Sequence, residues 1–281
     1  GGQDAAIVCE DASLDVAASG VLWGSFLNAG QTCCAIERVY VADSIADEFS
    51  QLLVGKLAQI RHGVPDGEIG SLTAKRQLEV VERHVKDAVD KGARVLAGGP
   101  SEGREDRGLW FTPTIIEGRG EEMACFREET FGPVLPIVRV RDEDEAIRRA
   151  NEDGHNLTSS VWTRDRRKGE AIAARLRAGT VSINDHAATA GAPWTPWGGV
   201  GESGYGRLNG MLGLREFTVA THVARNLMPS MKRLWWYPYD DATTRSLRAL
   251  TELVASPGLA RKTKAAGTAL RGAVRALRAK I

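Results

Sequence analysis

The sequence has little cysteine and no long apolar run. Its 281 residues include only four cysteines, Cys9, Cys33, Cys34 and Cys125. These are too few for a disulfide scaffold of this size, so we expect a reducing compartment. One of the four cysteines could then be a reactive thiol. No apolar run reaches the ~18 residues that a membrane-spanning helix needs. The composition therefore argues against a disulfide-rich secreted domain and an integral membrane protein, and it favours a cytoplasmic one.

A start signal is also missing. The chain opens on Gly1-Gly2-Gln3, and neither a methionine nor a signal peptide precedes its first strand-like run. We therefore expect a fragment or a processed product.

The near-neutral net charge of +1 hides an uneven distribution. Residues 229–281 contain eleven Lys or Arg and three Asp or Glu, a net charge of +8, whereas the rest of the chain carries −7. Such a basic tail can attract nucleic acid or an anionic membrane surface. The acidic body gives no reason to expect either, and we predict no nucleic-acid partner.

Strand and helix patterns alternate along most of the chain. Apolar runs predict strands at Ala6–Cys9, Arg38–Val41, Ala93–Ala97, Pro113–Ile116, Val134–Val140, Leu157–Thr163 and Thr180–Asn184. Helical spacing predicts helices over 14–26, 44–60, 78–92, 142–152 and 167–178. This rhythm is typical of an α/β fold with a mostly parallel open sheet flanked by helices. We expect a body over 1–215, a strand segment over 216–228 and a helical tail over 229–281.

The first candidate for chemistry is Cys33, which follows a glycine-terminated helix in Phe26–Cys33. A thiol on such a turn can point out of the core, and backbone N–H groups there can lower its pKa. The alternative is a small buried apolar residue, which is the commonest fate of a free cysteine. The spacing alone does not decide between them.

Two further segments are candidates for ligand binding. In Arg127–Val134, the carboxylate of Glu129 could accept hydrogen bonds from a sugar diol and Phe131 could pack on a ring; the alternative is a solvated charge run before a turn. The segment Pro196–Arg207 is dense in glycine, which permits close backbone approach. A phosphate-binding loop should follow a strand and open a helix, so a loop that lines a pocket fits better.

Taken in order, these segments resemble the aldehyde dehydrogenase superfamily over about residues 1–225. The resemblance is carried by four motifs: Gly30-Gln31-Thr32-Cys33, Glu129-Thr130-Phe131-Gly132-Pro133, Arg177 through Asn184, and Pro196-Trp197-Gly198-Gly199 through Arg207. It implies an aldehyde dehydrogenase catalytic domain that oxidises an aldehyde to a carboxylic acid with NAD or NADP.

The resemblance also implies roles for individual residues. Cys33 would be the nucleophile that forms a thiohemiacetal and then a thioester, with Cys34 as a bystander. Glu129 would bind the nicotinamide ribose and Phe131 would pack near the ring. Trp197 stands where the family usually has a phenylalanine beside the substrate tunnel. No metal site is expected.

The family pattern also places a general-base glutamate just before Leu-Gly-Gly, and this chain begins at Gly-Gly. We therefore expect the base and the dinucleotide-binding domain to lie upstream of Gly1, so that the chain by itself is inactive. Two alternatives stay open: a relative that passes the thioester to coenzyme A, and a non-catalytic homologue that serves as a structural partner.

The end of the homologous region predicts an oligomer. Residues Glu216–Val223 alternate like a strand, and by resemblance this segment pairs with another subunit in a homodimer or a homotetramer. An unpaired edge strand is a liability that oligomerisation removes. The alternative is an edge strand within the same chain.

The basic tail predicts an amphipathic helix. Its apolar stripe consists of Leu270, Val274, Leu277 and Ile281, with arginines and lysines beside it. Trp235, Trp236, Tyr237 and Tyr239 lie just upstream. This arrangement favours peripheral attachment to an anionic membrane surface. The alternative is a helix that packs on the acidic body.

Overall fold

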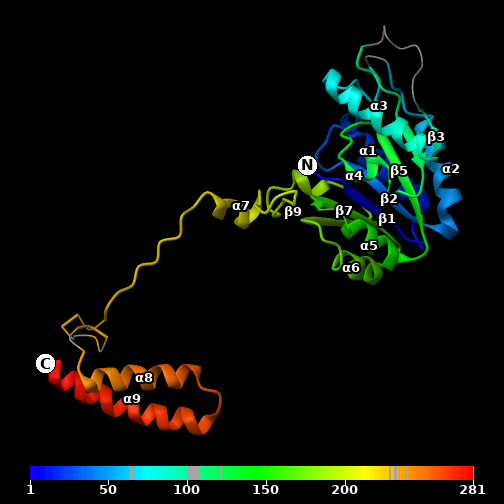
Figure 1. Cartoon of the computed structure of the whole chain (residues 1–281). Coiled ribbons are helices and arrows are strands. Elements are labelled where there is room, and N and C mark those ends of the chain that lie inside the picture. The colour runs from blue at the N-terminus through cyan, green and yellow to red at the C-terminus, as the bar shows by residue number, and fades with distance from the viewer. Residues whose placement is uncertain are drawn as a thin grey trace. The chain divides into compact units, whose positions relative to one another are not determined.

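The chain forms two compact units in a computed structural model. The structure describes residues 1–63, 66–99, 108–120, 122–152, 154–227, 229–230, 233, 235–237 and 239–280, without the side chains of 276–280. The first unit is Gly1–Val219 and the second is Ala220–Ile281. We describe each unit by itself (Figure 1).

The first unit is built on a seven-stranded sheet. Its strands are β1 (Asp4–Val8), β2 (Ile36–Ala42), β3 (Arg94–Ala97), β4 (Thr114–Glu117), β5 (Val134–Val140), β7 (Thr158–Trp162) and β8 (Thr180–Ile183). They lie in the order β3-β4-β5-β2-β1-β7-β8, and all neighbours are parallel except β3 and β4. Two short strands, β6 (His155–Asn156) and β9 (Val200–Gly201), form a separate antiparallel pair. The mostly parallel α/β sheet expected from the sequence is thus confirmed.

Helices cover both faces of this sheet. They are α1 (Leu14–Phe26), α2 (Ala46–Leu57), α3 (Lys75–Asp90), α4 (Ala124–Arg127), α5 (Glu143–Glu152) and α6 (Arg166–Ala173). The short helix α7 (Gly210–Glu216) lies away from the sheet (Figure 1), and there are 3₁₀ turns at η1 (Leu27–Gly30), η2 (Asp43–Ile45) and η3 (Ala188–Gly191). The connection β1-α1-β2 runs toward the β3 edge of the sheet, whereas β5-α5-β7 runs toward the β8 edge. Because parallel crossovers are right-handed, α1 and α5 lie on opposite faces.

The central strands form the core, because helices cover both faces of the sheet. Strand β1 is buried along its whole length, and β5 is buried except at Arg139. A strand covered on both faces is expected to be continuously apolar rather than alternating, as these two largely are. Among the largest fully buried side chains are Phe49 and Leu53 of α2 and Ile137 of β5.

The strand expected over Glu216–Val223 is absent. Helix α7 extends to Glu216, and residues 218–226 are not assigned to any strand or helix. Phe217, Val219 and Val223 are all highly exposed. A strand needs a partner for its backbone N–H and C=O groups, and no described segment of this chain pairs with 217–226. The prediction of an edge strand within the same chain is therefore wrong.

The second unit is a helical hairpin formed by α8 (Asp241–Ala255) and α9 (Leu259–Lys280). Asp240 caps α8, since its side chain accepts a hydrogen bond of 2.7 Å from the N–H of Thr243. The two helices meet through small side chains: Ser246, Ala249, Ala265 and Ala269 are buried. A Cβ at Gly272 would collide with Ser246 Oγ, so this glycine lets the helices approach closely.

Within the part of the chain that the structure describes, no helix is both long enough and apolar enough to span a lipid bilayer.

Candidate active site

The motif residues meet at the amino ends of the parallel strands. Gly1 and Gly2 precede β1, Cys33 precedes β2, Glu129 precedes β5, and Leu157 precedes β7. Amino ends of neighbouring parallel strands lie along one edge of the sheet, so segments far apart in sequence come together there. A Cβ at Gly2 would meet atoms of both Leu157 and Cys33, at 2.9 and 3.1 Å. The loops therefore assemble around the N-terminal glycines.

Cys33 lies on a tight turn after α1. Asn28, Ala29 and Gly30 have left-handed backbone conformations, with φ of 53°, 57° and 72°. Asn28 Nδ2 donates to the carbonyl oxygen of Gln31 at 3.0 Å, and Gln31 Nε2 donates back to the carbonyl oxygen of Asn28 at 3.0 Å. Gln31 Oε1 also accepts a hydrogen bond of 2.8 Å from the N–H of Thr73. The turn is thus fixed internally and tied to the segment before α3.

The turn packs directly on the loop that carries Glu129 and Phe131. A Cβ at Gly30 would collide with the carbonyl oxygen of Gly132, and a Cβ at Gly132 would collide with Val81 of α3. Gly30 is therefore required because two backbones touch there, whereas a side chain at Gly132 would meet the side chain of Val81.

Exposure distinguishes Cys33 from the other three cysteines. The structure describes all four, and only Cys33 is exposed. Burial raises the pKa of Cys9, Cys34 and Cys125 to about 12 each. These three thiols stay protonated near neutral pH, where the thiolate is the reactive form. For Cys33, the alternative of a small buried residue is therefore wrong.

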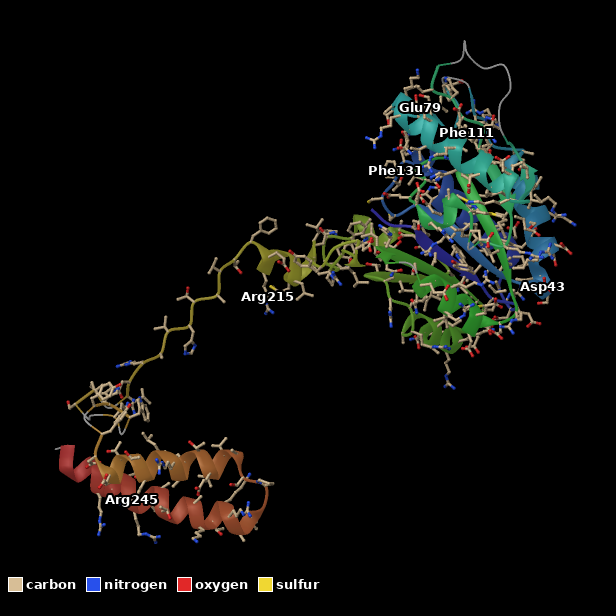
Figure 2. All side chains as sticks on the ribbon, viewed as in Figure 1. Asp43, Glu79, Phe111, Phe131, Arg215 and Arg245 are labelled. Carbon is tan, nitrogen blue, oxygen red and sulfur yellow. The ribbon has the colours of Figure 1, made fainter. Side chains whose placement is uncertain are left out.

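A buried carboxylate holds the neighbouring loop. Glu37 of β2 accepts hydrogen bonds from the N–H of Thr130 at 2.7 Å and from the N–H of Phe131 at 2.8 Å. Phe131, labelled in Figure 2, has a φ of 47°, which is uncommon for a large side chain. Burial raises the pKa of Glu37 to about 8 even though both hydrogen bonds act to lower it. Glu37 thus stabilises an unusual backbone that no local sequence preference supplies.

Helix α3 holds the same loop from the other side. Gln77 Nε2 donates to the carbonyl oxygen of Thr130 at 2.6 Å, and His84 Nδ1 lies 3.0 Å from Thr130 Oγ1. Burial lowers the pKa of His84 below its usual range, so the ring is neutral at neutral pH. Sequence reasoning missed Glu37, Gln77 and His84. The available signal was a charged pair, Glu37-Arg38, within an otherwise apolar strand.

One carboxylate oxygen of Glu129 receives no hydrogen bond from the described residues. This oxygen, Oε1, is buried. A Cβ at Gly1 would collide with this same oxygen, so the carboxylate lies against the N-terminal glycine. Since buried polar atoms normally have partners, this oxygen is suited to a ligand that supplies an O–H or N–H donor.

A buried histidine supports the peptide next to Cys33. His186 Nε2 lies 2.6 Å from the carbonyl oxygen of Cys34 and donates to it. Burial lowers the pKa of His186, so the neutral ring keeps this donor at neutral pH. His186 follows β8, whereas the loop of Glu129 precedes β5. In the strand order, β8 and β5 lie on opposite sides of the central strands β2 and β1. It fixes the backbone directly after the exposed thiol.

The glycine-rich segment forms a shaped loop, as expected. Trp197 and Leu208 exchange two backbone hydrogen bonds, of 2.7 and 2.6 Å. Trp197 lines a hollow of about 390 Å³ together with Leu157, Phe217 and the glycine loop. Ser203 Oγ donates to the carbonyl oxygen of Gly1 at 2.7 Å and so ties this loop to the N-terminus. Cys33 is not among the residues that line the hollow.

No group of three or more His, Cys, Asp or Glu residues suited to a metal ion occurs among the residues that the structure describes.

The exposure pattern predicts selective thiol chemistry. Alkylation of the native protein with iodoacetamide at neutral pH should modify Cys33 at least about tenfold faster than Cys9, Cys34 or Cys125, because only an accessible thiolate reacts. Peptide mass spectrometry over time gives the four rates. All four cysteines should react alike in urea, and equal rates for Cys33 and Cys34 in the native protein would contradict the assignment.

Glu37→Gln should lower the free energy of unfolding by about 1–3 kcal/mol, because the amide turns an N–H donor toward a loop N–H and leaves both unsatisfied. Urea denaturation measures the change. The matched control is Glu79→Gln on the surface of α3, also labelled in Figure 2, which should leave stability unchanged within about 0.5 kcal/mol. Equal midpoints for the two variants would show that Glu37 does not hold the loop.

The raised pKa of Glu37 also predicts a pH effect. The unfolded chain releases this proton near pH 4.5, whereas the folded protein keeps it up to about 8. The folded state therefore binds more protons in this window, and stability falls as the pH rises through it. The wild type should lose stability more steeply across that window than Glu37→Gln, and parallel slopes would contradict the raised pKa.

Comparisons with known proteins agree with this arrangement. The chain matches the aldehyde dehydrogenase family over residues 1–223. It is 42% identical over 240 residues to a Mycobacterium ulcerans protein with the provisional name of an NADP+ succinate-semialdehyde dehydrogenase, covering 82% of this chain and 46% of the relative. The chain spans about half the length of the curated relatives it matches.

Two solved structures show the same fold. Betaine aldehyde dehydrogenase from Staphylococcus aureus, in complex with NAD+, is 33% identical with a TM-score of 0.77, over 85% of this chain and 48% of that one. The NADP-dependent glyceraldehyde-3-phosphate dehydrogenase from Bacillus halodurans C-125, in complex with NADP, is 35% identical with a TM-score of 0.70, over 74% and 43%. With its sheet, its motif loops and most of its length matched, this chain belongs to the aldehyde dehydrogenase family.

Proposed function

We propose that the protein oxidises an aldehyde to a carboxylic acid with NAD+ or NADP+, and that Cys33 is the nucleophile. One observation carries the proposal: the only exposed thiol of the chain lies on a turn packed against the loop of Glu129 and Phe131. A covalent nucleophile must be accessible and held in place. Cys33 meets both requirements, whereas Cys34 is buried with a pKa of about 12.

The first half of the reaction is addition to the carbonyl group. The Cys33 thiolate attacks the aldehyde carbon, and the carbonyl oxygen becomes the oxyanion of a thiohemiacetal. That oxyanion needs donors already in position, and we assign the backbone N–H of Cys33 to this task. The hydrogen bonds of Asn28 and Gln31 on one side, and of His186 on the other, keep this backbone fixed during attack.

The residues before β5 fit a nicotinamide cofactor. The buried, unpartnered Oε1 of Glu129 suits the hydroxyl donors of a ribose, and Phe131 beside it offers a flat apolar surface for a ring. When bound, the cofactor accepts the hydride of the thiohemiacetal. This chain would orient the thiol relative to the cofactor, because the Gly30–Gly132 contact sets the separation between the turn that carries Cys33 and the loop that carries Glu129 and Phe131.

The second half of the reaction releases the acid from the Cys33 thioester. Water attacks the thioester carbonyl, and a general base takes its proton. Two acidic side chains close to the turn that carries Cys33 are already engaged in hydrogen bonds within the protein. Asp4 is buried and bonded to Thr158, and Glu37 binds the backbone of Thr130 and Phe131. We therefore assign the base to neither of them.

Trp197 is the proposed contact for the remainder of the aldehyde. It lines the hollow next to the glycine loop, where Leu157 adds an apolar surface. Its indole Nε1 is buried without a partner among the described residues, so it can donate to a substrate oxygen. Leu157 also lies beside Gly2, which in turn lies beside Cys33. Leu157, which lines the hollow, thus connects it through Gly2 to the backbone of Cys33.

Cys33→Ala should abolish aldehyde oxidation by the protein, because it removes the atom that forms the covalent intermediate. Production of reduced nicotinamide measures the rate. The matched control is Cys34→Ala, which should keep most of the activity. If Cys33→Ala stayed within about tenfold of the wild type, or ~1.4 kcal/mol of barrier, Cys33 would not be the nucleophile. Added coenzyme A should not change the product from acid to acyl thioester.

We further propose that the segment Glu216–Val223 pairs with a second copy in a homodimer or homotetramer. The exposed side chains of Phe217, Val219 and Val223 support this assignment. Phe217→Asp with Val219→Asp should shift the mass measured by light scattering toward the monomer, because two charges cannot be buried without partners. The matched control is Met211→Asp with Leu214→Asp, also exposed, on α7. An unchanged oligomer in the first variant would exclude the pairing.

A further inference from the structure

The hairpin of α8 and α9 exposes its large apolar side chains. Helices usually bury their largest apolar residues, yet here the buried interface consists of Ser246, Ala249, Ala265 and Ala269, with Gly272 between the helices. The small side chains let the two helices approach closely. Leu247 and Leu253 of α8 are half-buried, but other leucine and valine side chains of both helices are exposed and left for another contact.

These exposed residues form pairs one helical turn apart. Leu250 and Val254 on α8 are 38% and 81% exposed, and Leu270 and Val274 on α9 are 68% and 43% exposed. Residues at i and i+4 lie on one face of a helix. Each pair therefore forms a short apolar stripe on its own helix. We call these four residues the apolar face: Leu250, Val254, Leu270 and Val274.

Basic side chains lie beside the apolar face. Between residues 241 and 280 the chain has nine Lys or Arg and only two Asp or Glu. Arg245 (labelled in Figure 2), Arg248, Arg271 and Arg275 are exposed. The strong positive charge selects for an anionic partner.

Aromatic side chains precede the hairpin. Trp235, Trp236, Tyr237 and Tyr239 are between 49% and 82% exposed. Tryptophan and tyrosine combine an apolar ring with a polar group and are favoured where an apolar phase meets water. A polyanion such as DNA would use the arginines but has no need of exposed leucine and valine. A lipid surface uses the aliphatic, aromatic and basic groups together.

We propose that the hairpin docks on an anionic membrane surface. The apolar face lies at the boundary of the acyl chains, and the arginines beside it reach the lipid phosphates. Leu277 and Ile281, which complete the stripe expected from the sequence, lie outside the described side chains, so the proposal does not depend on them. It is also independent of the proposed aldehyde oxidation, because vesicle binding is measured without substrate.

The test is sedimentation of the whole protein with vesicles of phosphatidylcholine, alone or mixed with phosphatidylserine. The bound fraction should be at least about tenfold higher on the anionic vesicles, and it should fall as salt is raised from about 0.05 to about 0.5 M. Equal binding to the two kinds of vesicle, or to neither, overturns the proposal.

Two double variants separate the apolar and basic contributions. Leu270→Ser with Val274→Ser and Arg271→Gln with Arg275→Gln change only exposed side chains, so the hairpin should keep its helical circular dichroism. Each should lower vesicle binding by about tenfold or more. Matched changes in the first unit, Val89→Ser and Arg164→Gln with Arg167→Gln, should leave binding unchanged.

Other occupants of the hairpin give distinct results. If it packs on the acidic body or on a second copy, the serine variant pellets like the wild type or changes the mass by light scattering without affecting vesicles. If it binds nucleic acid, only the arginine variant loses affinity, for duplex DNA in a gel shift. Either outcome overturns the membrane assignment.

Discussion

The candidate site depends on a carboxylate that never faces solvent. Glu37 belongs to a central strand, yet its side chain ends on the backbone of Thr130 and Phe131, more than ninety residues along the chain. Its burial is costly, as the raised pKa shows, and a buried charge or acid is tolerated only when its hydrogen bonds are satisfied. The Glu129 loop supplies those bonds. Strand β2 and the loop of Glu129 and Phe131 therefore stabilise each other, and the turn that carries Cys33 lies directly before β2.

Much of the body could be predicted because its signals are local. Helix α1, strand β5 and the turn before Cys33 follow from hydrophobic spacing and from glycine placed after a helix. The roles of Glu37 and His186 could not be predicted, since each acts through a contact with a residue far away in sequence. A charged residue within a strand, or a histidine after one, can have many different hydrogen-bond partners. Only the packed structure determines which partner it has.

The strand predicted at Glu216–Val223 does not form within the single chain, and its pairing with a second copy stays a prediction. Alternating side chains are consistent with a strand, but pairing requires a second backbone, and the described part of this chain offers none there. The tail shows the reverse situation. One amphipathic helix was expected there from spacing, but α8 was not, and the use of small residues for the contact between α8 and α9 depends on how two segments meet.

The contact between Gly30 and Gly132 restricts how such a protein can change over time. Most tight contacts involve at least one side chain, so a larger residue on one side can be accommodated by a smaller one opposite. A Cβ at Gly30 would meet the backbone of Gly132, and no substitution at position 132 removes that backbone. Position 30 is therefore closed to gradual drift, whereas a side chain at position 132 would meet the side chain of Val81 and could be accommodated by a smaller residue there.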